Sequence, residues 1–217
     1  MREPLVAPAL LAALVLLLIL LALRPPGWVL ILFLVLLFVP GRWWHWKTRR
    51  FRRGLRQLKR GDTGTARSEL EAFLFQVARE SNYRRVQPYF NLGRSYPYQV
   101  AAHSNLGVCD LMEGKSEPAL ARFRTALAED PSWVPALYGV AVALKLLGHR
   151  EEAEASARQA LNLRPSYLAA RLLLGSLLTE AGRQVEADEF LAPIASEGQD
   201  PEALLQALDD QWGIGEM

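Results

Sequence analysis

Hydrophobic residues are concentrated at the beginning of the chain, where they form two long runs. Residues 5–23 are 19 residues without a charge, and residues 28–39 add 12 apolar residues. Nineteen helical residues rise roughly 28 Å, which is close to the hydrocarbon thickness of a bilayer, about 30 Å. The intervening Arg24-Pro25-Pro26-Gly27 would end the first helix and allow a tight turn. The pattern therefore predicts a transmembrane helical hairpin over residues 1–46.

The second apolar run leaves an alternative open. Its 12 residues reach only about 18 Å, although residues 27–46 are long enough to span if Pro40 kinks the helix without ending it. The alternative is one span followed by a re-entrant or interfacial segment. A cleaved signal peptide does not fit these long runs. The apolar core of a signal peptide has only about 7 to 15 residues and ends at a small-residue cleavage site.

Charge is divided unevenly along the chain. Residues 1–60 contain 11 Lys and Arg against one Glu, a net charge of +10, whereas residues 61–217 contain 14 against 22 Asp and Glu, a net charge of −8. Under the positive-inside rule, the basic run after the second apolar segment predicts a two-span protein of the inner (plasma) membrane with its soluble domain in the cytoplasm. The acidic remainder argues against a nucleic-acid partner.

The residues after the apolar runs follow a helical period. Phe51, Leu55 and Leu58 recur at i, i+4 and i+7, which predicts a basic juxtamembrane helix with one apolar face. Its basic residues are interpreted first as charge that sets the topology of the spans, and contact with anionic membrane lipids is the alternative role. The candidates for this membrane surface are Arg49, Arg50, Arg52, Arg53 and Arg56.

Residues 47–99 are expected to form a membrane-proximal unit before the main repeats. Gly61, followed by Ala66, Leu70 and Phe73, predicts a turn and the second helix of a partial repeat. Residues 81–99 then contain four of the six tyrosines together with arginines and prolines, which favours an aromatic linker folded over the end of the repeats. Stacking of these aromatic rings and arginines on bases, or contact with a partner, is the alternative.

A 34-residue period organises the remainder of the chain. Gly114, Gly148 and Gly182 recur at this spacing, and so do Pro131 and Pro165 after alanine- and leucine-rich runs. Such a period indicates stacked helical hairpins, because one hairpin cannot cover its own apolar face and stacking buries a continuous core. The glycines are expected to make the turn within each hairpin, and the prolines to follow its second helix.

At these positions the sequence resembles the tetratricopeptide repeat (TPR) family of α-solenoids. The resemblance implies an all-α fold, with three TPR-like repeats over residues 100–201 behind the transmembrane hairpin and a capping helix and tail over residues 202–217. His103, Leu137 and Arg171 depart from the family's usual aromatic residue early in the first helix. The matching residues are Leu106, Gly107, Ala119, Phe123, Ala126 and Pro131 in the first unit, Ala141, Ala153, Ala160 and Pro165 in the second, and Leu174, Gly175 and Ala187 in the third.

In the TPR family the first helix of each hairpin lines a concave groove, where segments of partner proteins bind. The resemblance therefore implies a protein partner in such a groove. The basic clamp that some members use for carboxylate termini is not evident, and Asn105 alone is suggestive of it. The candidate groove residues are Ser104, Val108, Tyr138, Val142, Lys145, Leu172, Ser176 and Thr179.

Catalytic chemistry finds little support in the sequence. The histidines are scattered, and no phosphate loop, nucleophile elbow or paired-histidine zinc motif occurs. Cys109 is the single cysteine and is expected to be an inert core thiol. His103 and Asp110 share a helix face and are interpreted as a buried polar pair. We therefore expect no enzyme activity, cofactor, bound metal or small-molecule substrate.

Together these patterns support one leading hypothesis and one alternative. The leading hypothesis is a membrane-anchored TPR scaffold that recruits a protein on the cytoplasmic face, with assembly or quality control of an envelope complex as the candidate process. The alternative is a membrane-surface factor that handles lipid or an envelope polymer through the basic helix and the aromatic segment.

Overall fold

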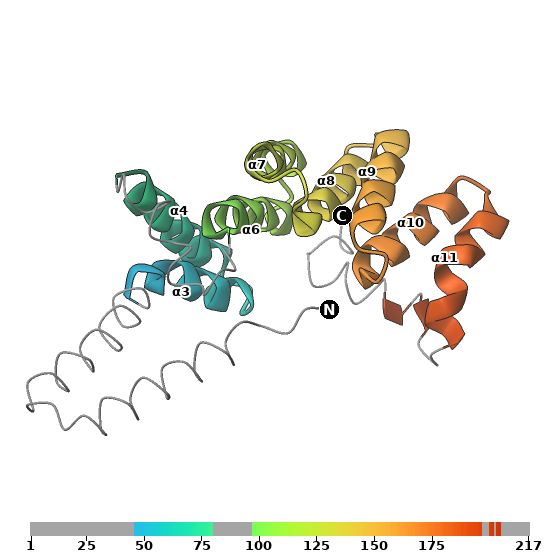
Figure 1. Cartoon of the computed structure of the whole chain (residues 1–217), viewed down its shortest axis with the longest axis horizontal. Helices are drawn as coiled ribbons and strands as arrows, with labels where there is room; N and C mark the ends of the chain where they lie inside the picture. Colours follow the sequence, from blue (N-terminus) through green and yellow to red (C-terminus); the bar gives the residue numbers. More distant parts are fainter. Residues whose placement is uncertain (1–45, 80–96, 197–199, 202, 205–217) are drawn as a thin grey trace, which may run out of the picture.

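The computed structural model describes residues 46–79, 97–196, 200–201 and 203–204 (Figure 1). Within these ranges the secondary structure is helical and contains no strand, which confirms the predicted all-α fold. The helices are α3 (Arg49–Leu58), α4 (Thr63–Arg79), α6 (Tyr98–Met112), α7 (Ser116–Glu129), α8 (Val134–Leu146), α9 (Arg150–Leu163), α10 (Leu168–Glu180) and α11 (Gln184–Ser196).

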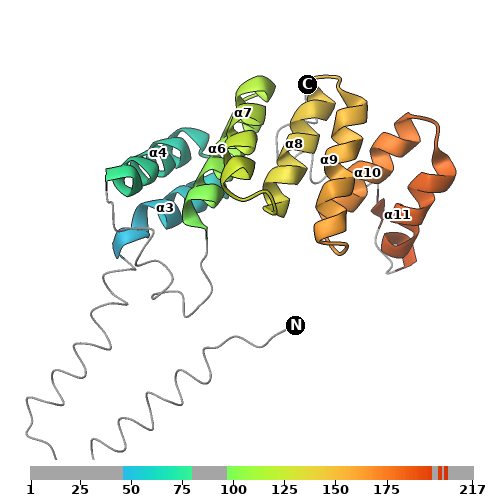
Figure 2. The ribbon, with the colours of Figure 1, turned by 45° about the horizontal axis from the view of Figure 1, so that its top comes forward.

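The helices are arranged as pairs stacked side by side. Each of α3–α4, α6–α7, α8–α9 and α10–α11 is joined by a short turn and packs along its length. The second helix of a pair also packs against the first helix of the next pair, as α7 does against α8. Figure 2 shows the pairs succeeding one another from α3–α4 at one end to α10–α11 at the other. This is the stacked-hairpin solenoid that the 34-residue period predicts.

Glycine makes the turn within the pairs, as the sequence predicts. Gly114, Gly148 and Gly182 have φ between +72° and +83°, a region that a side chain disfavours. The amide of the residue after each glycine donates to a carbonyl five residues earlier, for example Lys115 N to Asp110 O at 2.8 Å. This is the Schellman arrangement that satisfies the last carbonyls of a helix, and it recurs after Gly61 (φ +79°) at the end of α3.

The units contact each other through small residues and one large ring. The alanines at the repeat positions are fully buried, so that neighbouring helices approach closely. Phe123 of α7 lies against the backbone of Gly107 in α6 and of Gly139 in α8. A Cβ carbon built on Gly139 would lie 2.4 Å from the ring, and one on Gly107 would lie 2.8 Å from it. The ring therefore fills space that exists only because both helices lack a side chain there.

The α3–α4 pair is packed onto the solenoid rather than attached by a linker alone. Phe51 of α3, Phe73 of α4 and Tyr98 of α6 form an aromatic cluster with ring centroids 5.3 to 6.4 Å apart. The predicted apolar face of the basic helix is confirmed, because Phe51 is buried and Leu55 and Leu58 pack against the same cluster. The two cores also meet at Trp133, which packs against both.

Several sequence predictions concern residues outside the described ranges. Among the described helices, none has the length and apolar character needed to cross a bilayer. The predicted hairpin over 1–46 lies outside the described residues except for its last position, and so does the aromatic linker except for residues 97–99. Of the predicted capping helix only its opening is described, where Leu204 N donates to Asp200 O at 3.1 Å.

Substitution of Gly139 by alanine tests the contact between units. The added methyl group would meet the buried Phe123 ring at 2.4 Å, so the helices or the ring must move. We expect the free energy of unfolding to fall by about 1 to 3 kcal/mol, the usual cost of overpacking a core, measured by urea denaturation.

Gly64→Ala is the matched control. A Cβ at Gly64 meets nothing closer than 3.8 Å, so alanine there should raise the free energy of unfolding by about 0.5 to 1 kcal/mol through its better helix propensity. A Gly139→Ala variant as stable as the control would show that the ring does not constrain the two helices.

Candidate functional site

The first helices of the pairs form one continuous layer. α6 packs against α8, and α8 packs against α10, in addition to the contacts of each with its own second helix. We call this layer of α6, α8 and α10 the inner layer. The predicted groove residues all belong to α6, α8 and α10, so the fold places them in this inner layer.

Half of the predicted groove residues are part of the core. Ser104, Tyr138, Val142 and Leu172 are all at most 5% exposed. The ring of Tyr138 packs edge-on against Tyr167 with centroids 5.8 Å apart, which joins α8 to the start of α10. α8 is covered along residues 136–144, so its side chains support the layer from within.

The other four predicted residues, Val108, Lys145, Ser176 and Thr179, reach the surface at least in part. Lys145 Nζ donates to Ser176 Oγ at 2.9 Å and lies 2.9 Å from Glu180 Oε1, which bridges α8 and α10. Arg150 also approaches Glu180, at 3.6 Å. The structure thus brings Lys145 and Ser176 together in a polar cluster, whereas Thr179 bonds the Gly175 carbonyl of its own helix.

Sequence reasoning missed Glu180 in this polar cluster. Its spacing of four residues from Ser176 places it on the same helix face, which is the signal that could have identified it. Asn105, the residue suggestive of a carboxylate clamp, uses its amide within its own helix, where Nδ2 donates to Ala101 O at 2.6 Å.

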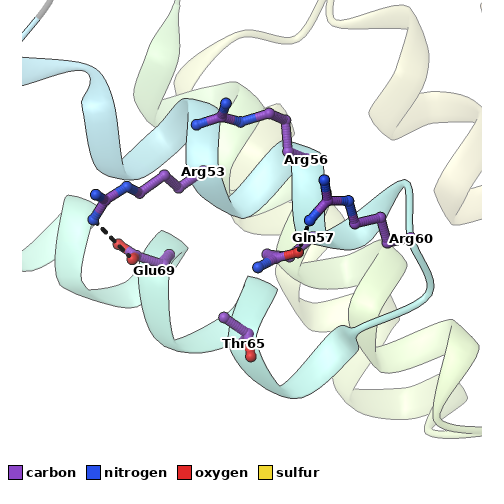
Figure 3. Close-up of a pocket in the computed structure, with 6 residues that line it drawn as sticks. All are labelled: Arg53, Arg56, Gln57, Arg60, Thr65 and Glu69. Atoms are coloured by element: carbon purple, nitrogen blue, oxygen red, sulfur yellow. Dashed lines mark hydrogen bonds and ion pairs between the residues drawn. The ribbon is translucent and has the colours of Figure 1, made fainter.

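The predicted membrane-surface arginines lie on the outer side of α3. Arg50 and Arg53 approach Glu69 of α4 at 3.9 and 3.7 Å. Arg53 and Arg56 border an open pocket of about 370 Å³ between α3 and the beginning of α4, shown in Figure 3. The pocket is also lined by Gln57, Arg60, Thr65 and Glu69, which were not among the predicted membrane-surface residues. Arg53, Arg56 and Arg60 share a helical spacing, which is the signal that could have identified Arg60.

A partly buried ion-pair network connects α4 to the end of α6. One guanidinium nitrogen of Arg67, Nη2, donates to Asp110 Oδ1 at 2.9 Å and to Glu113 Oε2 at 2.8 Å. Lys115 Nζ donates to the same Glu113 oxygen at 2.8 Å. The hydrogen bonds from Lys115 and then Arg67 lower the pKa of Glu113 to about 2, although burial opposes this shift. The network fixes the α3–α4 pair to the first full repeat.

The residues considered for catalytic chemistry, His103, Cys109 and Asp110, lie in structural environments. Asp110 pairs with Arg67, and His103 lies 3.9 Å from Glu129, so the two residues do not form the pair that the sequence suggested. Burial lowers the pKa of His103, and burial raises the pKa of the Cys109 thiol to about 11. Within the described ranges, no group of three or more His, Cys, Asp or Glu residues is placed to hold a metal ion.

The arrangement is similar to solved TPR structures. A thermophilic TPR protein of Thermus thermophilus matches with a TM-score of 0.57 and 19% identity over 77% of this chain and 84% of that chain. A Podosopora anserina protein with nearly identical TPR-like repeats of the kinesin-light-chain type matches with a TM-score of 0.52 and 19% identity over 68% of this chain and 72% of that chain. No protein-family model and no curated protein matches the sequence. The similarity establishes a TPR-like fold.

The Glu113 network makes a prediction about pH. Because the folded pKa of Glu113 is below its ordinary value of 4.5, its ionised form stabilises the fold above that value, and the contribution is lost as pH falls toward about 2. We therefore expect the destabilisation caused by Glu113→Gln to be full at pH 6 and to shrink progressively below about pH 4.5, measured by urea denaturation across this range.

Glu189→Gln is the control, because Glu189 is exposed and has no ion-pair partner among the described side chains. Its effect on the free energy of unfolding should be small and independent of pH. If the effect of Glu113→Gln were equally independent of pH, the ion pairs with Arg67 and Lys115 would not contribute to stability.

Proposed function

We propose that this protein is a membrane-anchored scaffold whose TPR-like solenoid binds a polypeptide segment of a partner protein along its inner layer. The supporting observation is the stack itself. Four helix pairs bury one another's apolar faces and leave an extended surface formed by successive first helices. Such a surface offers many weakly specific contacts in a row, which suits a peptide or helix better than a small molecule.

The surface of this inner layer is polar where it is accessible. Lys145, Ser176 and Glu180 present a donor and acceptors at the junction of α8 and α10, with Arg150 beside them. A peptide lying across the junction can replace the Lys145–Glu180 ion pair, because a partly exposed pair contributes little to stability. Tyr138 and Val142 of α8 are buried and pack in the core beside this surface.

The membrane anchor rests on the sequence. The 19 and 12 apolar residues of the two N-terminal runs, with the basic residues after them, support a two-span anchor in the inner membrane and a cytoplasmic solenoid. The anchor restricts the solenoid to the bilayer surface, which raises its effective concentration toward partners in the same membrane. Assembly or quality control of an envelope complex is the process that fits this restriction.

The groove proposal is tested by charge reversal at the accessible polar cluster. A photo-crosslinking residue at position 179 of the full chain should give a discrete adduct with a protein partner in native membranes. We expect Lys145→Glu to reduce this adduct by about tenfold, because one lost charge-assisted contact is worth about 1.5 kcal/mol. Far-ultraviolet circular dichroism should be unchanged, since the side chain is partly exposed.

Arg124→Glu serves as the control, because Arg124 is exposed on the second helix of its pair. It should leave the adduct at its original yield. An adduct that survives Lys145→Glu, or that is lost equally in both variants, would place the partner elsewhere on the solenoid.

The anchor is tested separately by extraction and topology. The full chain should stay in the membrane fraction through alkaline carbonate treatment, because two apolar helices hold it there. Protease added to right-side-out vesicles should leave tags at both termini intact, and detergent should expose both tags. Release by carbonate, or digestion of only one tag in intact vesicles, would contradict the two-span arrangement without affecting the groove.

A further inference from the structure

The outer half of α3 carries a dense positive charge whose orientation is fixed. Phe51 and Gly54 face inward and are buried, and a Cβ on Gly54 would lie 2.8 Å from Leu70 of α4. The helix therefore cannot rotate to hide its opposite side. That side contains no acidic residue and carries Arg49, Arg52, Arg53, Arg56, Lys59 and Arg60.

Much of this charge lacks a counter-charge. The side chains of Arg49, Arg56 and Lys59 have no ion-pair or hydrogen-bond partner among the described residues. Glu69 is shared between Arg50 and Arg53 at 3.9 and 3.7 Å, which neutralises at most one of them. By contrast, three arginines of α4, α9 and the α10–α11 turn, Arg67, Arg158 and Arg183, each lie within 3 Å of a carboxylate oxygen.

Two exposed aromatic side chains border the basic face. Trp46 is 62% exposed and lies three residues before the first residue of α3, whose Arg49, Arg53 and Arg56 follow the three- and four-residue spacing of one helix face. Phe75 of α4 is 65% exposed, and the Arg79 guanidinium carbon lies over its ring, 5.6 Å from the ring centroid. Phe75 and Arg79 share a second open pocket with Arg50, so the surface is continuous from α4 to α3.

The pocket between the helices has the composition of a phosphate site. Arg53 and Arg56 of α3, and Arg60 in the turn just after it, extend around the pocket, with the Gln57 amide beside them (Figure 3). Arg60 Nη1 reaches only Gln57 Oε1, at 3.5 Å, so its guanidinium keeps donors for another acceptor. Guanidinium groups bind phosphate through paired hydrogen bonds, and three of them compensate for the single carboxylate of Glu69.

We propose that this face of the α3–α4 pair docks onto a bilayer surface of anionic phospholipids, with a headgroup phosphate in the pocket of Arg53, Arg56 and Arg60. Exposed Trp among arginines suits the interface between headgroups and acyl chains. Residues 61–217 have a net charge of −8, so the positive charge that attracts an anionic surface is confined to the residues before Gly61. The apolar runs that immediately precede α3 also place a bilayer, rather than another polyanion, beside it.

Docking would orient the whole solenoid. α3 is held to α4 and α6 by the Phe51, Phe73 and Tyr98 cluster and by the Arg67 network. Fixing α3 against headgroups therefore fixes the direction in which the inner layer faces. This inference concerns a surface separate from the groove and does not depend on a protein partner.

The test measures headgroup contact at α3 in the full chain, reconstituted into nanodiscs. A fluorescent label on Gln57→Cys reports the pocket, because Cys109 is fully buried and its raised pKa keeps it unreactive at neutral pH. The label should be shielded from acrylamide when about 30 percent of the lipid is phosphatidylglycerol, and exposed in phosphatidylcholine alone or in about 0.5 M salt.

The Arg49→Gln/Arg56→Gln double variant removes two charges that have no structural partner. We expect the ratio of docked to undocked protein to fall about 30-fold, on the basis of about 1 kcal/mol for each basic residue near the surface. Arg124→Gln/Arg164→Gln removes two exposed arginines of the solenoid that have no ion-pair partner among the described side chains, and it should leave the shielding unchanged. Circular dichroism should be the same for all variants.

Three outcomes would overturn the proposal. The first is shielding that is equal in phosphatidylcholine and phosphatidylglycerol nanodiscs, which would reduce the arginines to topogenic charge. The second is an equal effect of the two double variants, which would indicate only net charge. The third is that glycerophosphate or a single-stranded RNA oligonucleotide, added to phosphatidylcholine nanodiscs, shields the label as well as phosphatidylglycerol does. That result would assign the pocket to a free phosphate or to nucleic acid.

Discussion

The contact between the Phe123 ring and two glycines is the constraint on which the stack depends. The ring extends from α7 and occupies the space left by Gly107 and Gly139, so three helices from two successive units share one packing element. An aromatic ring has few rotamers, and a fully buried one cannot shift without opening a cavity. The relative position of the α6–α7 and α8–α9 pairs is therefore set by shape rather than by hydrogen bonds. The geometry of the inner layer depends on that fit.

The sequence predicted the helix pairs because their signals are local or periodic. The turn glycines and the small residues recur every 34 positions, and a backbone with positive φ leaves little choice of residue. The exposure of individual groove positions could not be predicted in the same way. Tyr138 and Val142 occupy positions that a single hairpin would expose, but α8 has neighbours on both sides, and the Tyr167 ring of the following unit covers Tyr138. Glu180 was missed because its partner Lys145 belongs to another unit.

The basic helix shows how one segment serves two demands. Positive charge after an apolar segment sets membrane topology in any protein, so composition alone cannot separate that role from a structural one. The structure adds that α3 is the first helix of a packed pair, with Phe51 in an aromatic cluster and Gly54 against Leu70. The basic residues are consequently held in a fixed array, which a free juxtamembrane tail would not provide.

The order of contacts along the stack also bears on how the protein would yield to force. The α3–α4 pair is secured by the aromatic cluster and the Arg67 ion pairs, whereas among the described helices α11 packs chiefly on α10 at the opposite end. In a structure with mainly nearest-neighbour contacts, unravelling begins at the unit with one neighbour. A load applied beyond α11 would therefore unfold the α10–α11 pair first and leave the α3–α4 and α6–α7 pairs folded. The described solenoid would then unfold under force one pair at a time.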